Sequence, residues 1–186
     1  MRVIAGEARH LPLKTVPGDN TRPTTDRIKE TLFNILHQQL PGAVFVDLFA
    51  GSGGIGIEAL SRGAKEAWFV DNAAAAVAVI SENLRFTKLF PRANVLRADA
   101  AASVDRLEAK GVRADFIFMD PPYEAGAEPA VLARLSASPV VTEDTVIIIE
   151  TALHRDLSFV EEAGFTVTRV KEYKTNQHVF AIRSSQ

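Results

Sequence analysis

The fold of this chain is decided by residues 44–60, which read VFVDLFAGSGGIGIEAL. An apolar run typical of a buried strand enters a glycine-rich turn, and the chain leaves that turn with the apolar spacing of a helix. Gly51, Gly53 and Gly56 give the spacing G-x-G-x-x-G. Glycines at such positions let the backbone turn sharply, approach a ligand closely and pack the helix against its strand. The segment therefore predicts a strand–loop–helix unit that binds a nucleotide-like ligand.

Three segments of strand type end in an aspartate, at Asp47, Asp71 and Asp99. The carboxyl ends of parallel strands lie at one edge of an open α/β sheet, and such sheets bind their ligands at that edge. We expect Asp71 to accept hydrogen bonds from both ribose hydroxyls of a cofactor, and Asp99 to reach an adenine edge. The predicted cofactor-binding residues are Asp47, Phe49, Ala50, Gly51, Ser52, Gly53, Gly56, Asp71, Asn72, Asp99 and Ala100.

The residues around the loop favour one kind of cofactor over two others. No Gly-Lys-Ser/Thr follows, so the loop is not a P-loop. A nicotinamide dinucleotide would bring its pyrophosphate to the helix N-terminus, close to the carboxylate of Asp47, and like charges repel. S-adenosylmethionine carries an ammonium and a sulfonium and no phosphate, so Asp47 can pair with its positive charge. We therefore predict S-adenosylmethionine as the cofactor.

The reaction motif is Asp120-Pro121-Pro122-Tyr123, directly after the apolar strand 114–119. The two prolines end the strand ladder and hold the loop in an extended shape. Methylation of an exocyclic amino group on a base needs acceptors for its N–H bonds, because its lone pair is delocalised into the ring. Asp120 and the Pro121 carbonyl can be those acceptors, while Tyr123 stacks on the base. We predict that these four residues form the catalytic motif.

Length and composition indicate a globular enzyme of one domain. The chain has 186 residues, of which 47% are hydrophobic and 24% are charged. We expect one methyltransferase domain over residues 1–186, with residues 1–40 forming an N-terminal hairpin and helix. No cysteine is present, which excludes thiolate catalysis, and the four histidines have no ligand spacing, so we predict no metal. No apolar run reaches membrane-spanning length, and we expect a cytoplasmic protein without a membrane partner.

The rest of the chain predicts further strands and helices. The N-terminal part predicts short strands over residues 2–5 and 11–15, and then a helix capped by Thr24 or Thr25, with Ile28, Leu32, Ile35 and Leu36 on its apolar face. Further helices are expected over residues 74–87, 101–109, 126–135 and 156–163, and further strands over 145–150, 164–173 and 178–183.

Positive charge is concentrated at the two ends of the sequence. The net charge is −2, but residues 1–30 carry six Lys and Arg against four acids, and residues 165–186 carry four against one. The two ends therefore carry a combined net charge of +5, and residues 31–164 carry −7. If the fold brings the ends together, this distribution predicts a modest basic face beside an acidic body. The residues that we expect to contact a substrate RNA are Arg22, Thr24, Asp26, Arg27, Lys171 and Lys174.

Taken together, these motifs resemble the RsmD family. The resemblance rests on the glycine loop, Asp71 and Asp120-Pro121-Pro122-Tyr123, preceded by the more family-specific residues 22–36. It implies a Rossmann-like class I methyltransferase fold with a seven-stranded, mostly parallel sheet whose last strand is antiparallel. It also implies methylation of the exocyclic N2 of one guanine in small-subunit (16S) ribosomal RNA. Family members often carry a basic G-R-K-L run where this chain has His10-Leu11-Pro12-Leu13, which leaves fewer phosphate contacts.

Two other functions are compatible with the motifs. An adenine-N6 methyltransferase also uses D-P-P-Y, although DNA enzymes of that class usually bring a target-recognition domain, for which 186 residues leave no room. A non-catalytic module that binds the cofactor or RNA is the other alternative.

Because few basic residues can hold naked RNA, we expect the substrate to be an exposed guanine in a partly assembled 30S particle.

Overall fold

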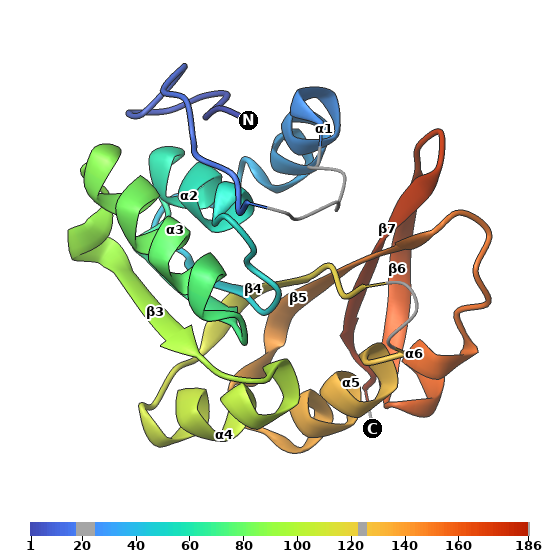
Figure 1. The fold of residues 1–186 in the computed structure, drawn as a ribbon. Coiled ribbons are helices and arrows are strands. Elements are labelled where there is room, and N and C mark those ends of the chain that lie inside the picture. The colour runs from blue at the N-terminus through green and yellow to red at the C-terminus, as the bar shows by residue number, and fades with distance from the viewer. Residues whose placement is uncertain (18–24, 123–125, 186) are drawn as a thin grey trace. The chain divides into compact units, whose positions relative to one another are not determined.

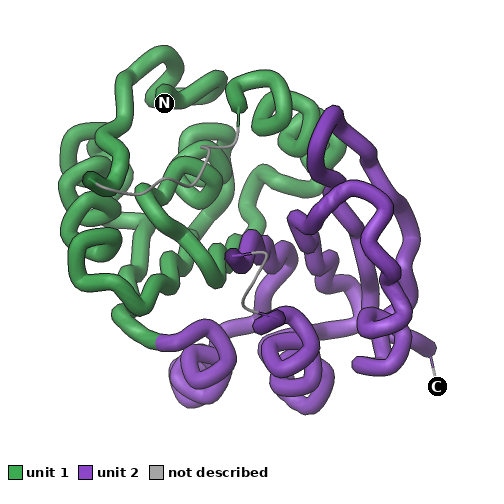
Figure 2. Tube along the Cα trace, turned by 45° about the vertical axis from the view of Figure 1, so that its right-hand side comes forward, with its two compact units in different colours: residues 1–98 green, residues 99–186 purple. Residues whose placement is uncertain are grey.

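The computed structural model describes residues 1–17, 25–122 and 126–185. The chain forms two compact units, residues 1–98 and residues 99–186, which Figure 2 distinguishes by colour. The single domain over residues 1–186 stays a prediction. Among the described residues, no helix combines the length and the apolar character that crossing a membrane requires.

The described residues of the first unit form three parallel strands joined through helices (Figure 1). β2 is the middle strand, because it pairs with β1 through Val46 and Trp68 and with β3 through Phe69 and Val95. The helix α2 packs on β1 and β2, and α3 packs on β2 and β3. The elements are α1 (Asp26–Leu36), β1 (Val44–Asp47), α2 (Gly54–Ser61), β2 (Glu66–Asp71), α3 (Ala74–Phe86), the 3-10 helix η1 (Phe90–Arg92) and β3 (Ala93–Arg97). The predicted strand–loop–helix unit over residues 44–60 is confirmed.

Helix α1 begins as predicted, and Leu32 and Leu36 of its predicted apolar face are buried, but the buried face is rotated. Thr25 is the N-cap, and its hydroxyl accepts a hydrogen bond from the Ile28 amide at 3.3 Å. The buried residues are Lys29, Leu32, Phe33 and Leu36, whereas the predicted core residues Ile28 and Ile35 are only partly buried. The face is rotated because Lys29 finds a carboxylate partner inside the unit.

The predicted N-terminal hairpin is present in a reduced form. Residues 1–3 and 11–13 run antiparallel, with backbone hydrogen bonds from Val3 to Leu11 and from Leu13 to Met1. Only one isolated bridge forms, between Arg2 and Pro12, so the two regular strands expected over residues 2–5 and 11–15 are absent from the described structure. The proline has no N–H to donate and stops the ladder at that point.

In the second unit, the residues that the structure describes form four strands in the order β4-β5-β7-β6. β4 and β5 are parallel, and β7 is antiparallel to both β5 and β6. The elements are α4 (Ala100–Ala109), β4 (Ala114–Met119), α5 (Glu128–Ala137), β5 (Val141–Ala152), α6 (Ser158–Glu162), β6 (Phe165–Glu172) and β7 (Asn176–Arg183). β5 is longer than the predicted 145–150, since its first residues pair with Ala114 across a register irregularity.

The chain has the predicted α/β fold class. The strands follow the order β3-β2-β1 in the first unit and β4-β5-β7-β6 in the second, and β7, the last strand, is antiparallel to its partners. The strands are almost fully buried in β1, β2 and β4, and they read as continuous apolar runs. Parallel sheets covered by helices on both faces produce this pattern.

Candidate functional site

The glycine loop lies in the first unit, between β1 and α2. Gly53 is the N-cap residue of α2 and has φ +84°, a conformation that favours glycine. Its N–H donates to the Ala50 carbonyl at 2.7 Å, which closes the turn. A Cβ on Gly56 would lie 2.4 Å from the Phe69 ring on β2, so a side chain there would force the helix away from the strand. The sharp turn and the close helix packing expected from the spacing are therefore present.

Asp71 ends β2, and its carboxylate forms a hydrogen bond with the glycine loop. One carboxylate oxygen accepts a hydrogen bond from the Gly51 amide at 2.9 Å, and the other accepts from the Ala73 amide at 2.9 Å. The side chain is only partly buried. Each carboxylate oxygen has capacity for a further hydrogen bond, as binding of ribose hydroxyls would require.

Asp47 ends β1 and carries an unpaired polar atom. Its side chain is buried, and Oδ1 has no hydrogen-bond partner among the described residues. Burial raises the pKa of Asp47 to about 7, and the charge of Asp71 acts in the same direction. Hydrogen bonds with the backbone of Gly56 and Phe49 lower the pKa and so oppose this shift. A buried, incompletely paired carboxylate is costly unless another group compensates it. The chemistry of this position fits a cationic ligand group.

The sequence interpretation missed Asn83, which supports the loop from α3. The side chain is buried, and its Nδ2 donates to the Ser52 carbonyl at 2.9 Å and to the Lys14 carbonyl at 3.0 Å. Its Oδ1 accepts from the Lys14 amide at 2.9 Å. A lone asparagine in a helix has no local signal for such a role, because its partners lie 31 and 69 positions away.

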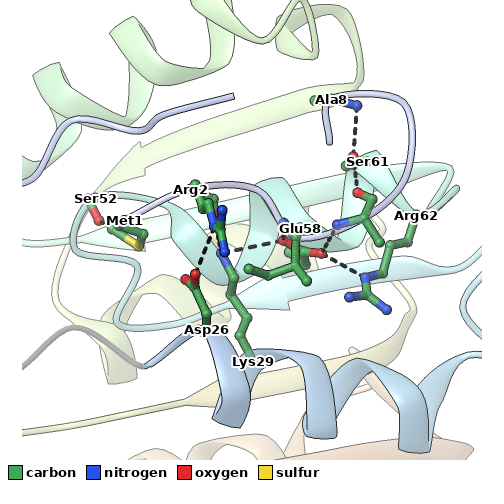
Figure 3. A network of polar contacts seen from close by, with 11 residues as sticks. Met1, Arg2, Ala8, Asp26, Lys29, Ser52, Glu58, Ser61 and Arg62 are labelled. Atoms are coloured by element: carbon green, nitrogen blue, oxygen red, sulfur yellow. Dashed lines mark hydrogen bonds and ion pairs between the residues drawn. The ribbon is translucent and has the colours of Figure 1, made fainter. Parts of the chain in front are cut away.

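The sequence interpretation also missed Glu58, a buried carboxylate on the apolar helix α2. Its oxygens accept from the Ile4 amide at 2.8 Å and the Ala5 amide at 3.0 Å. They also accept from Arg62 Nε at 2.7 Å, a contact that Figure 3 shows. Lys29 Nζ lies 3.4 Å from Glu58, and both side chains are almost fully buried. Burial lowers the pKa of Lys29, and the charge of Glu58 opposes that shift. An acid within an apolar helix is the sequence signal that could have found this group.

The same network brings the N-terminal residues to the loop. Met1 lies at the start of α2, where a Cβ on Gly54 would come within 2.5 Å of its sulfur. Figure 3 shows the Met1 side chain beside Ser52, whose hydroxyl is 3.9 Å from the sulfur. Residues 1–8 are fixed to α2 by Glu58 and by Ser61, whose hydroxyl accepts from the Ala8 amide at 3.0 Å.

The reaction motif lies in the second unit, directly after β4. Asp120 is partly buried, Pro121 is buried and Pro122 is exposed. Tyr123 lies outside the described residues. The prolines lack backbone N–H groups and so end the ladder at Met119, as the sequence predicts.

The remaining predicted cofactor residues divide between the two units. Asp99 and Ala100 begin the second unit, where Asp99 is the N-cap of α4 and accepts from the Ala102 amide at 3.1 Å. Asn72 is exposed in the first unit. The adenine contact of Asp99 stays a prediction beside its role as a helix cap.

Comparisons with known proteins identify the family. The family model described as "Conserved hypothetical protein 95" matches residues 1–183. The Escherichia coli (strain K12) protein "Ribosomal RNA small subunit methyltransferase D" is 34% identical over 173 residues, which are 92% of this chain and 84% of that protein. This chain belongs to the RsmD family.

Other relatives extend the RsmD family match. "Putative rRNA methyltransferase YlbH" of Bacillus subtilis (strain 168) is 38% identical over 172 residues, 92% of each protein. The solved structure "Putative methyltransferase yhhF from Escherichia coli" has a TM-score of 0.84 and 29% sequence identity, and the match covers 100% of this chain and 99% of that chain. The Rossmann-like class I methyltransferase fold implied by the family resemblance is confirmed.

The block of residues 22–36 typical of the RsmD family is only partly described. Arg22 and Thr24 lie outside the described residues. Asp26 forms an ion pair with Arg2, with 2.8 Å between Oδ2 and Nε (Figure 3), and Arg27 is exposed. The carboxylate of Asp26 therefore orients an arginine of the N-terminal segment.

The two lysines predicted to contact RNA lie in the second unit. Lys171 is exposed on β6, and Lys174 is exposed in the turn before β7. Elsewhere in the described ranges, no group of three His, Asp or Glu side chains could hold a metal ion.

Proposed function

We propose that this chain transfers a methyl group from S-adenosylmethionine to the exocyclic N2 of one guanine in small-subunit ribosomal RNA. Support comes from membership of the RsmD family and from relatives whose names describe ribosomal RNA methyltransferases. The observation that carries the proposal is Asp47, a buried carboxylate beside a glycine loop, one of whose oxygens has no hydrogen-bond partner in residues 1–17, 25–122 and 126–185.

The residues of the first unit fit the cofactor. Asp47 would pair with its positive charge, the backbone of Gly51 and Gly53 would let it approach closely, and Asp71 would accept hydrogen bonds from its ribose. The full set proposed to hold it is Asp47, Phe49, Ala50, Gly51, Ser52, Gly53, Gly56, Asp71, Asn72, Asp99 and Ala100. When bound, S-adenosylmethionine would supply an electrophilic methyl group: its methyl–sulfur bond would break as the methyl–nitrogen bond forms, and the amino nitrogen would release one proton to solvent.

The residues of the motif prepare the amino group. Asp120 and the Pro121 carbonyl accept hydrogen bonds from its N–H groups, which localises the nitrogen lone pair and favours its attack. Pro122 keeps the loop extended, and Tyr123 stacks on the base. Acceptor groups around the base suit guanine, because N1–H and N2–H are both donors, whereas N1 of adenine is an acceptor.

The charge distribution limits the form of the substrate. Arg22, Thr24, Asp26 and Arg27 near the N-terminus, with Lys171 and Lys174 in the second unit, are the residues that we propose for RNA contacts. Few phosphate contacts give weak binding to naked RNA with a shallow salt dependence. We therefore propose that the substrate is a guanine exposed in a partly assembled 30S particle, where RNA shape and ribosomal proteins supply further contacts.

Methyl transfer to defined substrates tests the proposal. The purified protein is incubated with methyl-labelled S-adenosylmethionine and either deproteinised small-subunit RNA or reconstituted particles, and the RNA is digested to nucleosides. We expect the label in N2-methylguanosine, with a higher initial rate on particles. Label in N6-methyladenosine, or none on either substrate, would contradict the proposed chemistry. Equal or faster labelling of bare RNA at physiological salt would contradict only the proposed substrate form.

A further inference from the structure

A second cluster of buried polar side chains lies in the unit of residues 99–186, on β5, β7 and the turn before β7. Glu150 of β5 and His178 of β7 are a directly opposed antiparallel pair. Glu150 Oε2 lies 2.9 Å from His178 Nε2, and Glu150 Oε1 accepts from Asn176 Nδ2 at 2.6 Å. His178 Nδ1 lies 3.2 Å from the hydroxyl of Tyr173. The proposed transfer of the methyl group uses none of these four side chains.

The hydrogen bonds of this cluster have one direction when the imidazole is neutral. The Glu150 carboxylate can only accept, so His178 Nε2 carries the proton. Nδ1 is then an acceptor, and Tyr173 supplies the hydrogen. Burial raises the pKa of Tyr173 to about 12, and the charge of Glu150 acts in the same direction, so the phenol keeps its proton at neutral pH. The phenolic oxygen thus gives its only hydrogen to His178 and keeps its lone pairs for a donor from outside.

The cluster is packed against the strand that carries the reaction motif. The rings of Phe118 and His178 meet edge to face, with 5.8 Å between their centroids, and Phe118 lies two residues before Asp120. Met119 of β4 is in register with Ile149 of β5. Asp120 and Glu150 are therefore the next residues of two neighbouring parallel strands, at the sheet edge where such folds bind ligands.

Tyr173 also has an exposed side. Its ring meets the His178 ring edge to face at a centroid distance of 5.0 Å, yet the residue is only half-buried, whereas His178 is fully buried. The neighbouring Lys171 and Lys174 are exposed. The end of this hairpin thus presents two exposed lysines, which suit phosphates, beside the phenolic oxygen of Tyr173. That oxygen is oriented by the buried pair His178 and Glu150.

We propose that Glu150 and His178 orient Tyr173 so that its phenolic oxygen accepts a hydrogen bond from N1–H of the target base and thereby selects guanine. This inference rests on the proposed function and names a specificity residue for it. Tyr173 touches the substrate, and His178 and Glu150 are positioning residues that act through it. A base whose N1 is an acceptor would meet the lone pairs of the phenol and be rejected.

A substituted substrate tests this role directly. Once the methylated guanosine is mapped, a ligated RNA carries 2,6-diaminopurine at that position and is assembled into the particle. This base keeps the 2-amino group but presents N1 as an acceptor. We expect the wild type to prefer guanine in kcat/KM, and Tyr173→Phe to lower that preference about tenfold without changing cofactor affinity. His154→Gln, a change of an exposed histidine in the same unit, is the matched control and should keep the preference.

Two further measurements distinguish the orientation of Tyr173 by His178 from a purely structural role of His178. If His178 acts through Tyr173, His178→Gln combined with Tyr173→Phe loses no more preference than Tyr173→Phe alone. Nitrogen-15 NMR should show the Nε2–H tautomer of His178 in the wild type. An unchanged preference in a folded Tyr173→Phe protein overturns the inference while N2-methylguanosine still forms. A wild type that forms no N2-methylguanosine overturns the proposed function itself.

Discussion

Two buried carboxylates, Asp47 in the first unit and Glu150 in the second, differ in how their oxygens are paired. Both end up at the carboxyl side of buried strands. Asp47 Oδ1 has no hydrogen-bond partner within the described part of the chain, and burial raises the pKa of Asp47 to about 7. Glu150 has both oxygens paired, to Asn176 and to His178. An orphaned acceptor indicates a position completed by a ligand, whereas a satisfied one indicates a group that holds its neighbours in place.

The largest effect is expected from removing a paired carboxylate inside the first unit. Glu58→Ala leaves Lys29 buried without its counter-charge and frees two backbone amides, so we expect a loss of about 3–5 kcal/mol in the free energy of unfolding. Urea denaturation measures this change. Glu82→Ala, which breaks the exposed pair with Lys14, is the control and should change stability little. A loss for Glu58→Ala as small as that of the control would show that the buried network does not stabilise the unit.

The next effect separates the chemistry proposed for the second unit from the cofactor binding proposed for the first. Asp120→Ala removes an acceptor for the amino group, and we expect kcat to fall at least about a hundredfold, or about 2.7 kcal/mol. The Kd for S-adenosylmethionine should stay within about tenfold, as calorimetry can measure. Asp144→Ala, a change of an exposed acid on β5, should leave both quantities unchanged. Near-normal turnover in Asp120→Ala would remove Asp120 from the catalytic role.

A third change removes the hydrogen-bond partner of one Glu150 oxygen, so that this carboxylate is incompletely paired like that of Asp47. Asn176→Ala removes the amide that donates to Glu150 Oε1, and a buried carboxylate that loses a hydrogen bond costs about 1–3 kcal/mol. We expect thermal and urea unfolding to show that loss, and Asn34→Ala on the exposed face of α1 to show almost none. Stability equal to the wild type in Asn176→Ala would mean that pairing does not distinguish the two carboxylates.

The smallest effect concerns the ionisation of Asp47. A cationic ligand needs the ionised carboxylate, but a pKa of about 7 leaves much of Asp47 protonated below neutral pH. The Kd for S-adenosylmethionine should therefore rise about tenfold, or about 1.4 kcal/mol, as the pH falls from 7.0 to 5.5. Asp47→Asn should bind weakly at both values, without this slope. Equal slopes in the two proteins would assign the pH dependence to another group.

The sequence predicted the parts of the site that depend on local pattern. The apolar strand before Asp47, the glycine turn and the two prolines after β4 are signals within a few residues, and the structure has each of them. Glycine conformation and proline chemistry act locally, so no tertiary information is needed to read them.

The sequence did not predict the buried polar networks. Glu58 is joined to Lys29, 29 positions away, and Glu150 to His178, 28 positions away. Such pairs are made by tertiary packing, and a single acid or histidine has no periodic signal that names its partner. The rotated face of α1 has the same cause, since a buried lysine is expected only once its carboxylate partner is known.

Nucleoside mass spectrometry of small-subunit ribosomal RNA tests the central claim most directly. RNA is compared from cells with the wild-type protein, without it, and with Asp120→Ala in its place. We expect that one N2-methylguanosine disappears without the protein, is present with the wild type and does not return with Asp120→Ala. An unchanged N2-methylguanosine content, or the loss of a different modified nucleoside, would contradict it.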